Sequence, residues 1–139
     1  MLIYGHDKEV AAWAAGRLGL SNYEPCTAIG VEKDGFIVGA ALFNNYHPEL
    51  SIEISLVCLD KRQFTRQNIK KILAYPFIQL RVKRVQATCS KRNKIVRSFL
   101  ERTGFRLEGI SRLGWREGGD AAVYSLIKPD WENHELFKP

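Results

Sequence analysis

The fold is decided by one stretch in the second half of the chain, Asn93-Lys-Ile-Val-Arg-Ser-Phe-Leu-Glu-Arg-Thr-Gly-Phe-Arg-Leu-Glu-Gly-Ile-Ser-Arg112. Asn93 can cap a helix, because its side chain can accept a hydrogen bond from an amide of the first turn. One face of that helix carries residues at helical spacing that are mostly apolar, namely Ile95, Val96, Phe99, Leu100 and Thr103. Gly104 is typical of the residue that follows a helix. The stretch therefore predicts a capped amphipathic helix and then a strand over Phe105–Arg112.

The segment before Asn93 predicts another helix and another strand. Thr65 can cap a helix with an apolar stripe made of Ile69, Ile72, Leu73 and Phe77. Pro76 should end or kink this helix near Tyr75, since proline has no amide hydrogen to donate. Apolar and polar side chains then alternate over Arg84–Ser90, which predicts a strand.

The first half of the chain predicts a helix followed by a meander of strands. Asp7–Leu18 has helical periodicity. Thr27–Glu32 and Phe36–Tyr46 flank an Asp-Gly pair, and such a pair between apolar runs indicates a hairpin. Leu50–Leu59 alternates as a third strand. Its mostly polar row consists of Ser51, Glu53, Ser55 and Val57.

The end of the chain completes the fold class. Ala121–Ile127 predicts a last strand, joined to Phe105–Arg112 through a polar turn. The order of elements, a helix, a meander and then alternating helices and strands, predicts an α+β (mixed α/β) sheet covered by helices. With 139 residues and no repeat or linker, residues 1–139 are expected to form a single domain.

Composition excludes several classes of protein. The chain is 45% hydrophobic and 26% charged, which argues against disorder. No apolar run approaches the ~20 residues that span a bilayer, and Met1–His6 lacks the features of a signal peptide. Cys26, Cys58 and Cys89 have no metal-site spacing, so we expect three buried thiols, no metal and a cytoplasmic location.

The charge is concentrated in the middle of the sequence. The whole chain carries a formal charge of +6, but residues 60–112 contain fifteen Lys and Arg against three Asp and Glu, a net of +12. The remaining residues have a net charge of −6. This polarity indicates that the middle of the chain faces an anion, unless it is a solvated basic helix face without a ligand.

One loop in this basic region has the features of a pyrophosphate site. The segment from Leu56 to Ile69 reads as a strand end, a loop and the helix that starts at Thr65. The first amides of a helix have no internal partner and carry partial positive charge. Lys61, Arg62 and Arg66 add full charges around them. The loop contains no glycine and matches neither GxxxxGK[ST] nor GxGxxG, so it is not a nucleotide P-loop.

The stretch Asn93 to Arg112 resembles the second cofactor-side motif of the GNAT superfamily of acyl-coenzyme A-dependent N-acetyltransferases. In that motif an Asn follows the fifth strand, an amphipathic helix comes next, and Gly-Phe and Glu-Gly open the following strand. Gly119-Asp120 through Tyr124 and Trp131 resemble the ribosomal-protein N-terminal acetyltransferases. Thr65-Arg66 and Tyr75-Pro76-Phe77 resemble phage and prophage members. The resemblance covers about Thr27 to Trp131.

The resemblance implies a GNAT-like central, mostly antiparallel twisted sheet of six to seven strands, with splayed fourth and fifth strands around a cleft for acetyl-CoA. Those strands would be Leu50–Leu59 and Arg84–Ser90. Backbone groups near Leu56, Val57 and Cys58 would line the pantetheine arm, and Asn93 would contact it. The pyrophosphate would be bound by Arg62, Thr65, Arg66 and Gln67. The nucleotide phosphates would have Lys91, Arg92 and Arg97 as partners.

The chain also departs from the family. The usual phosphate loop, Gln/Arg-x-x-Gly-x-Gly/Ala, is replaced by Lys61-Arg-Gln-Phe-Thr-Arg66, so affinity would depend on side-chain cations. The frequent tyrosine acid four residues before the Gly-Phe glycine is Leu100 here. Glu53 matches the carboxylate that often takes the amine proton, and Tyr124 is the preferred acid. His47 is a second candidate base.

These observations predict a GNAT-type N-acetyltransferase that moves acetyl from acetyl-CoA to an amine acceptor in a ternary complex, as a monomer or homodimer. The acceptor would be a protein N-terminus, a lysine or a small amine. Two alternatives stay open. The basic segment also suits a nucleic-acid-binding or DNA-modifying relative, and a GNAT domain without catalysis could serve as an interaction module.

Overall fold

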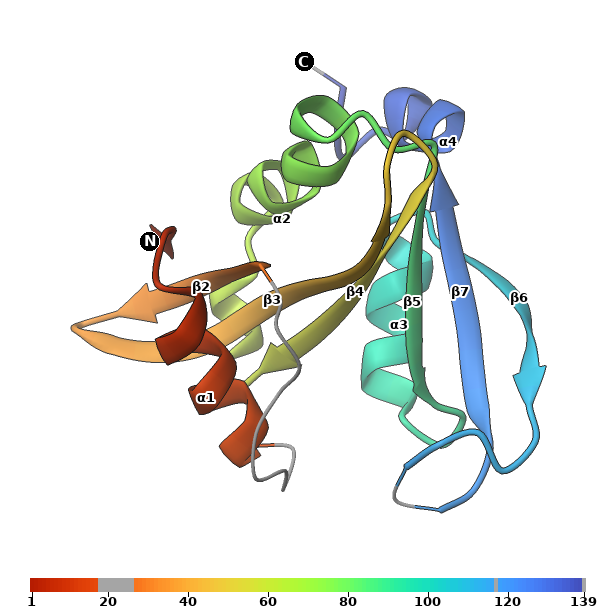
Figure 1. Ribbon diagram of the computed structural model, residues 1–139, viewed down its shortest axis with the longest axis horizontal. Helices are drawn as coiled ribbons and strands as arrows, with labels where there is room; N and C mark the ends of the chain where they lie inside the picture. The colour runs from red at the N-terminus through yellow and green to blue at the C-terminus, as the bar shows by residue number, and fades with distance from the viewer. Residues whose placement is uncertain (18–26, 117, 139) are drawn as a thin grey trace.

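The computed structural model describes residues 1–17, 27–116 and 118–138, which form a seven-stranded sheet with helices on both faces (Figure 1). The elements are β1 (Leu2–Ile3), α1 (Asp7–Arg17), β2 (Thr27–Lys33), β3 (Phe36–His47), β4 (Ser51–Cys58), a 3-10 turn (Lys61–Gln63), α2 (Arg66–Ala74), a π-helical turn (Tyr75–Gln79), β5 (Arg84–Ser90), α3 (Lys94–Arg102), β6 (Arg106–Ser111), β7 (Ala121–Ile127) and α4 (Lys128–Asn133).

The sheet opens between its two central strands. Its strand order is β1-β2-β3-β4-β5-β7-β6, and among the described strands β4 and β5 pair in parallel whereas the other pairs are antiparallel. The β4–β5 pairing covers four residue pairs, from Ser51 with Arg84 to Ile54 with Ala87. Beyond them the two strands diverge (Figure 1). The predicted α+β fold with splayed fourth and fifth strands is therefore confirmed.

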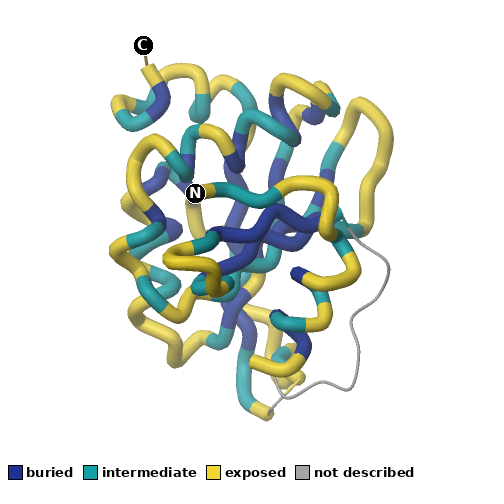
Figure 2. The backbone as a smooth tube through the Cα atoms, turned by 90° about the vertical axis from the view of Figure 1, so that its left-hand side faces the viewer, coloured by how far each residue is buried: buried dark blue, intermediate teal, exposed yellow. Residues whose placement is uncertain are grey.

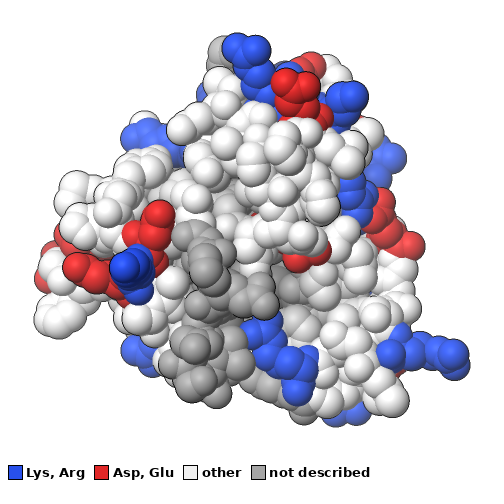
Figure 3. Space-filling view, in the orientation of Figure 1, with Lys and Arg blue, Asp and Glu red and all other residues white. Residues whose placement is uncertain are grey.

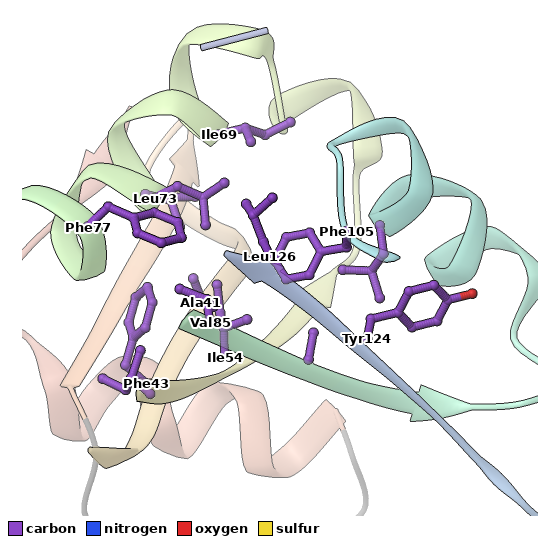
Figure 4. Packing of buried hydrophobic residues seen from close by; sticks show 14 of the residues in the cluster. Ala41, Phe43, Ile54, Ile69, Leu73, Phe77, Val85, Phe105, Tyr124 and Leu126 are labelled. Atoms are coloured by element: carbon purple, nitrogen blue, oxygen red, sulfur yellow. The ribbon is translucent and has the colours of Figure 1, made fainter. Parts of the chain in front are cut away.

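The two faces of the sheet are covered differently. On one face, α2 and α3 contribute Ile69, Leu73 and Leu100 to a core that continues into Ile54 of β4. Burying each such side chain contributes about 1.5–3 kcal/mol. Figure 4 shows how Ile54, Ile69 and Leu73 pack in this core, and Figure 2 shows buried stretches in the strands and exposed loops around them.

On the other face, α1 covers only the β2–β3 part of the sheet. Its Val10 and Ala14 pack against small residues of these strands, Ala28 and Ala40, and against Leu42. In Figure 1, α1 lies in front of the sheet and α3 behind β5. The part of this face beyond α1, which includes the polar side chains of β4 and β5, is called the open face below.

Helix ends follow the predicted chemistry. Thr65 Oγ1 accepts a hydrogen bond from the Asn68 amide at 3.1 Å, and Asn93 Oδ1 accepts one from the Val96 amide at 3.1 Å. Gly104 ends α3 with a φ of +95°, a conformation that suits glycine. Leu18, the predicted last residue of the first helix, lies outside the described residues.

The region around Pro76 differs in detail from the prediction. The α-helix ends at Ala74, as expected, but the chain continues through a π-helical turn that contains Pro76. Two short elements were not predicted, β1 and α4. Trp131 of α4 stacks on Phe77 with ring centroids 4.9 Å apart, which attaches the C-terminal segment to that turn.

The expectation of three buried thiols is wrong at one position and holds at another. Cys89 is buried, and burial raises the pKa of its thiol. Cys58 is exposed, because it ends β4 past the last pairing with β5. Cys26 lies outside the described residues. In residues 1–17, 27–116 and 118–138, no helix is both long and apolar enough to cross a membrane.

Candidate acyl-transfer cleft

A cavity of about 100 Å³ lies where β4 and β5 diverge. Its walls come from both strands, from α3 with its cap Asn93 and from the β6–β7 loop: Ile54, Ser55, Leu56, Ala87, Thr88, Cys89, Asn93, Val96, Leu100, Trp115 and Arg116. Of the predicted residues, Leu56 and Asn93 thus line one cavity. The gap left by the lost strand pairing is therefore bordered by α3 and by the β6–β7 loop.

Strand alternation identifies which backbone groups face this cleft. The Leu59 amide donates to the Val38 carbonyl of β3 at 2.8 Å. Because backbone direction alternates along a strand, the backbone groups of Val57 also point toward β3. Those of Leu56 and Cys58 point toward the side from which β5 has departed. Of the three predicted arm contacts, the geometry thus favours Leu56 and Cys58.

A second cavity, of about 290 Å³, lies on the open face. It is lined by Asn44, Glu53, Ile54, Ser55, Gln86, Thr88, Gly114, Trp115 and Arg116. Its wall shares Ile54, Ser55, Thr88, Trp115 and Arg116 with the first cavity. The two cavities are therefore neighbours across the sheet, and Glu53 lines the one on the open face.

Glu53 is held by two side-chain amides. Asn45 Nδ2 and Gln86 Nε2 both donate to its Oε1, at 3.2 and 3.4 Å. The side chain is partly buried and belongs to the predicted polar row of β4. His47, the second candidate base, is exposed at the end of β3 and does not line the 290 Å³ cavity.

Tyr124 lies on the opposite face of the sheet from Glu53. Its hydroxyl accepts a hydrogen bond from Arg97 Nε at 2.9 Å and donates one to Glu101 Oε2 at 3.2 Å. The contact with Tyr124, together with the nearby Glu101 carboxylate, raises the pKa of Arg97 above its ordinary value. Figure 4 shows the Tyr124 oxygen pointing away from the other labelled side chains. The structure does not bring the two predicted catalytic residues together in either cavity.

The predicted pyrophosphate loop borders a groove of about 820 Å³ between α2, α3 and the C-terminal segment. Lys61 and Arg66 line it, together with Arg102 of α3. The Arg66 guanidinium donates to the carbonyls of Glu135 and Leu136, at 2.7 and 3.1 Å. Arg66 is thus turned toward the C-terminal segment.

Arg62 is also engaged within the loop. Its guanidinium donates to both carboxylate oxygens of Asp60, at 3.0 and 3.2 Å, and holds the pKa of Asp60 below its usual range. Gln67 is exposed in the first turn of α2. Arg97 points to Tyr124 and to the Lys91 carbonyl, which Nη1 reaches at 3.0 Å.

Phe64 anchors the glycine-free loop to the sheet. The residue is buried, and its ring lies against Gly39 of β3, where an added Cβ would be 2.9 Å from the ring Cζ. The ring also meets Phe99 of α3 edge to face, with centroids 6.2 Å apart. The loop is therefore fixed by an apolar contact.

Several residues at the two cavities were not predicted from the sequence. Gln86 and Asn45 contact Glu53, and Trp115 and Arg116 line both cavities. Alternation along Arg84–Ser90 could have placed Gln86 on a polar face, but only the β4–β5 register puts it opposite Glu53. Within the described ranges, no group of three or more His, Cys, Asp or Glu could hold a metal ion.

A mostly antiparallel sheet that opens between one parallel pair of strands, with helices on both faces, is the GNAT class of fold. The family model described as "Acetyltransferase (GNAT) domain" matches residues 4–106. Since this match takes in more than half of the chain, the protein belongs to that family.

Known relatives agree with this assignment. The chain is 35% identical over 69 residues to YdaF of Bacillus subtilis (strain 168), which is provisionally named a ribosomal N-acetyltransferase. The match takes in 48% of this chain and 38% of that protein, so the chain aligns with about two fifths of this curated relative.

Two solved structures show the same fold. A chimera of the spermidine N-acetyltransferase SpeG from Vibrio cholerae with hSSAT has a TM-score of 0.74 at 15% identity, over 94% of this chain and 98% of that chain. Mycobacterium smegmatis RimJ in complex with CoA-disulfide has a TM-score of 0.67 at 22% identity, over 89% of this chain and 61% of that chain.

Proposed function

We propose that the protein is an N-acetyltransferase that transfers the acetyl group of acetyl-CoA directly to an amine acceptor. The observation that carries this proposal is the parting of β4 and β5 after four residue pairs, with one cavity on the α3 side and a second at Glu53. A thioester arm between the strands and an amine on the open face would meet there.

Acetyl-CoA would supply the acetyl group as an activated thioester. The outward backbone groups of Leu56 and Cys58, together with Asn93, would hold the arm. The amides and side chains at the start of α2, from Thr65 to Gln67, would bind the pyrophosphate, because helix N-termini favour anions. Arg62 and Arg97 are nearby cations for the phosphates.

The acceptor amine would be deprotonated by Glu53, directly or through a water molecule, so that its nitrogen lone pair can attack the thioester carbonyl. The new C–N bond forms as the C–S bond breaks, and the departing thiolate takes up a proton. Tyr124 is the proposed donor of that proton. For this role its O–H must leave Glu101 and turn toward Ala87, the neighbour of Tyr124 in β5 that lines the cleft.

The acceptor class remains a protein N-terminus, a lysine or a small amine. The relatives suggest two of these classes, since one is named for ribosomal and another for spermidine acetylation. In Figure 3, drawn from the side of the open face, the acidic and basic side chains of the described residues are scattered and form no continuous basic surface. This argues against a nucleic acid as the partner of the open face. A cytoplasmic location and a monomer or homodimer belong to the same proposal.

Ligand-dependent melting tests the proposal first. Acetyl-CoA at about 100 times its Kd should raise the melting temperature by about 5 °C or more, because it binds the folded state alone. An amine panel with peptides, lysine analogues and polyamines should then consume acetyl-CoA and release free thiol. The absence of both a melting shift and thiol release would contradict the proposal and favour an interaction module.

A further inference from the structure

A chain of hydrogen-bonded side chains crosses the open face and ends at Glu53. Arg84 Nη1 and Nη2 donate to the two carboxylate oxygens of Glu108 on β6, at 2.8 and 2.6 Å. Arg84 Nη2 also donates to Gln86 Oε1 at 2.7 Å. Gln86 Nε2 reaches Glu53 Oε1 at 3.4 Å, where Asn45 Nδ2 arrives from β3. Four strands thus contribute to one polar ladder, defined here as Asn45, Glu53, Gln86, Arg84 and Glu108.

Arg84 determines which way the donors and acceptors of the polar ladder point. A guanidinium has only donors, so Gln86 must present its carbonyl oxygen to Arg84. The other end of the same amide, the NH₂ group, then points to Glu53. Glu108 keeps Arg84 in place, and their hydrogen bonds raise the pKa of Arg84 and lower that of Glu108. Both groups are therefore charged at neutral pH, and the orientation persists.

The two carboxylate oxygens of Glu53 differ in their hydrogen bonds. Both amide donors converge on Oε1, whereas Oε2 receives no hydrogen bond from the residues that the structure describes. Glu53 also lines the 290 Å³ cavity on the open face. The hydrogen bonds to Oε1 thus hold the carboxylate in place, and Oε2 stays available to an amine or a water molecule.

We propose that Gln86 is a positioning residue for Glu53, and that the Arg84–Glu108 pair sets the orientation of its amide. The inference rests on the proposed function, because it assigns to Gln86 the task of presenting Glu53 Oε2 to the acceptor. Gln86 itself neither donates nor accepts a proton in the reaction.

Two variants of Gln86 distinguish its positioning of Glu53 from a contribution to packing alone. Gln86→Glu keeps the shape and the contact with Arg84, but it places a carboxylate against Glu53 instead of an N–H donor. Gln86→Met keeps the length and removes the donor. We expect both to lower kcat by at least about tenfold with acceptor KM changed by less, since misplacing a catalytic group is costly. Gln79→Glu, at an exposed position after α2, is the matched control.

The readouts must exclude a folding or cofactor defect. The melting shift with acetyl-CoA should be equal in the wild-type protein and in all three variants, because Gln86 lies on the open face. Wild-type kcat in both Gln86 variants would overturn the inference. A loss of the melting shift in parallel with kcat would also overturn it, because the role would then be structural.

An NMR titration of the Glu53 side-chain carboxyl separates this inference from the proposed function. In Gln86→Glu the titration of Glu53 should move to higher pH, because two adjacent carboxylates resist simultaneous ionisation. An unchanged midpoint would overturn the contact, whatever the activity. If the wild-type protein transfers no acetyl group but the midpoint moves, the proposed function fails, and with it the catalytic purpose of Gln86.

Discussion

The two sides of the cleft are prepared for binding in opposite ways. On the α2–α3 side, three predicted phosphate ligands already have partners in the chain: Arg62 with Asp60, Arg66 with the carbonyls of Glu135 and Leu136, and Arg97 with Tyr124. On the open face, Glu53 is fixed at one oxygen and available at the other. If the α2–α3 side binds acetyl-CoA as proposed, its arginines must exchange partners on binding, whereas Glu53 on the proposed acceptor side is already held in place.

This difference matches the chemistry required of each side. A phosphate is a strong acceptor and can displace a carbonyl or an exposed carboxylate from arginine, since water screens such surface contacts. A general base must lie within hydrogen-bond distance of the group whose proton it takes, directly or through one water molecule. The arginines can therefore move when the proposed phosphates bind, whereas movement of the Glu53 carboxylate would slow proton transfer.

The largest effect is expected from removing Glu53, the proposed base on the open face. Glu53→Gln keeps the shape and should lower kcat by about 10³-fold, within the range for general acid–base catalysis. Acetyl-CoA affinity should stay unchanged, because Glu53 does not line the cleft on the α3 side. Steady-state kinetics and calorimetry measure the two quantities. A wild-type rate across the pH range would discard the assignment of Glu53 as base.

The second test removes Phe64, which anchors the proposed pyrophosphate loop. Phe64→Ala should lower the free energy of unfolding by about 3 kcal/mol, because it deletes a buried ring packed on Gly39 and Phe99. Denaturant unfolding measures this loss. Phe64→Leu is the control and should lose less. If both variants are as stable as the wild type, the loop is not held by Phe64.

The smallest expected effects concern individual cofactor contacts. Arg66→Ala and Asn93→Ala should each weaken acetyl-CoA binding by about tenfold, the range of one charge-assisted hydrogen bond. Arg62→Ala should weaken it less, because the Arg62 guanidinium already binds Asp60 on both oxygens. Calorimetry gives the three affinities. Unchanged affinity in Arg66→Ala and Asn93→Ala would remove the site from this side of the cleft.

The elements around the cleft could be predicted because their signals are local. The predicted bounds of β5 and β7 are confirmed, and side-chain caps at Thr65 and Asn93 marked the helix starts. The short elements β1 and α4 have too few residues for a periodic pattern. Their stability comes from contacts with distant segments, such as Trp131 on Phe77.

The site was only partly predictable for the same reason. The polar face of Glu53 follows from alternation within β4, but the donors to Glu53 come from β3 and β5. Likewise, the basic loop was visible in the sequence, whereas the partners of its arginines were not. A single sequence indicates which face of the sheet a residue occupies, but the register between strands determines which side chains it contacts.

The contact between Gly39 and Phe64 has a consequence for sequence evolution. Glycine at position 39 leaves the space on β3 that the ring occupies, and a Cβ there would overlap it. Neither residue can change size alone without strain or a void. Among relatives whose phosphate loop lacks glycine, positions 39 and 64 should therefore covary, a small residue in the strand accompanying a large one in the loop.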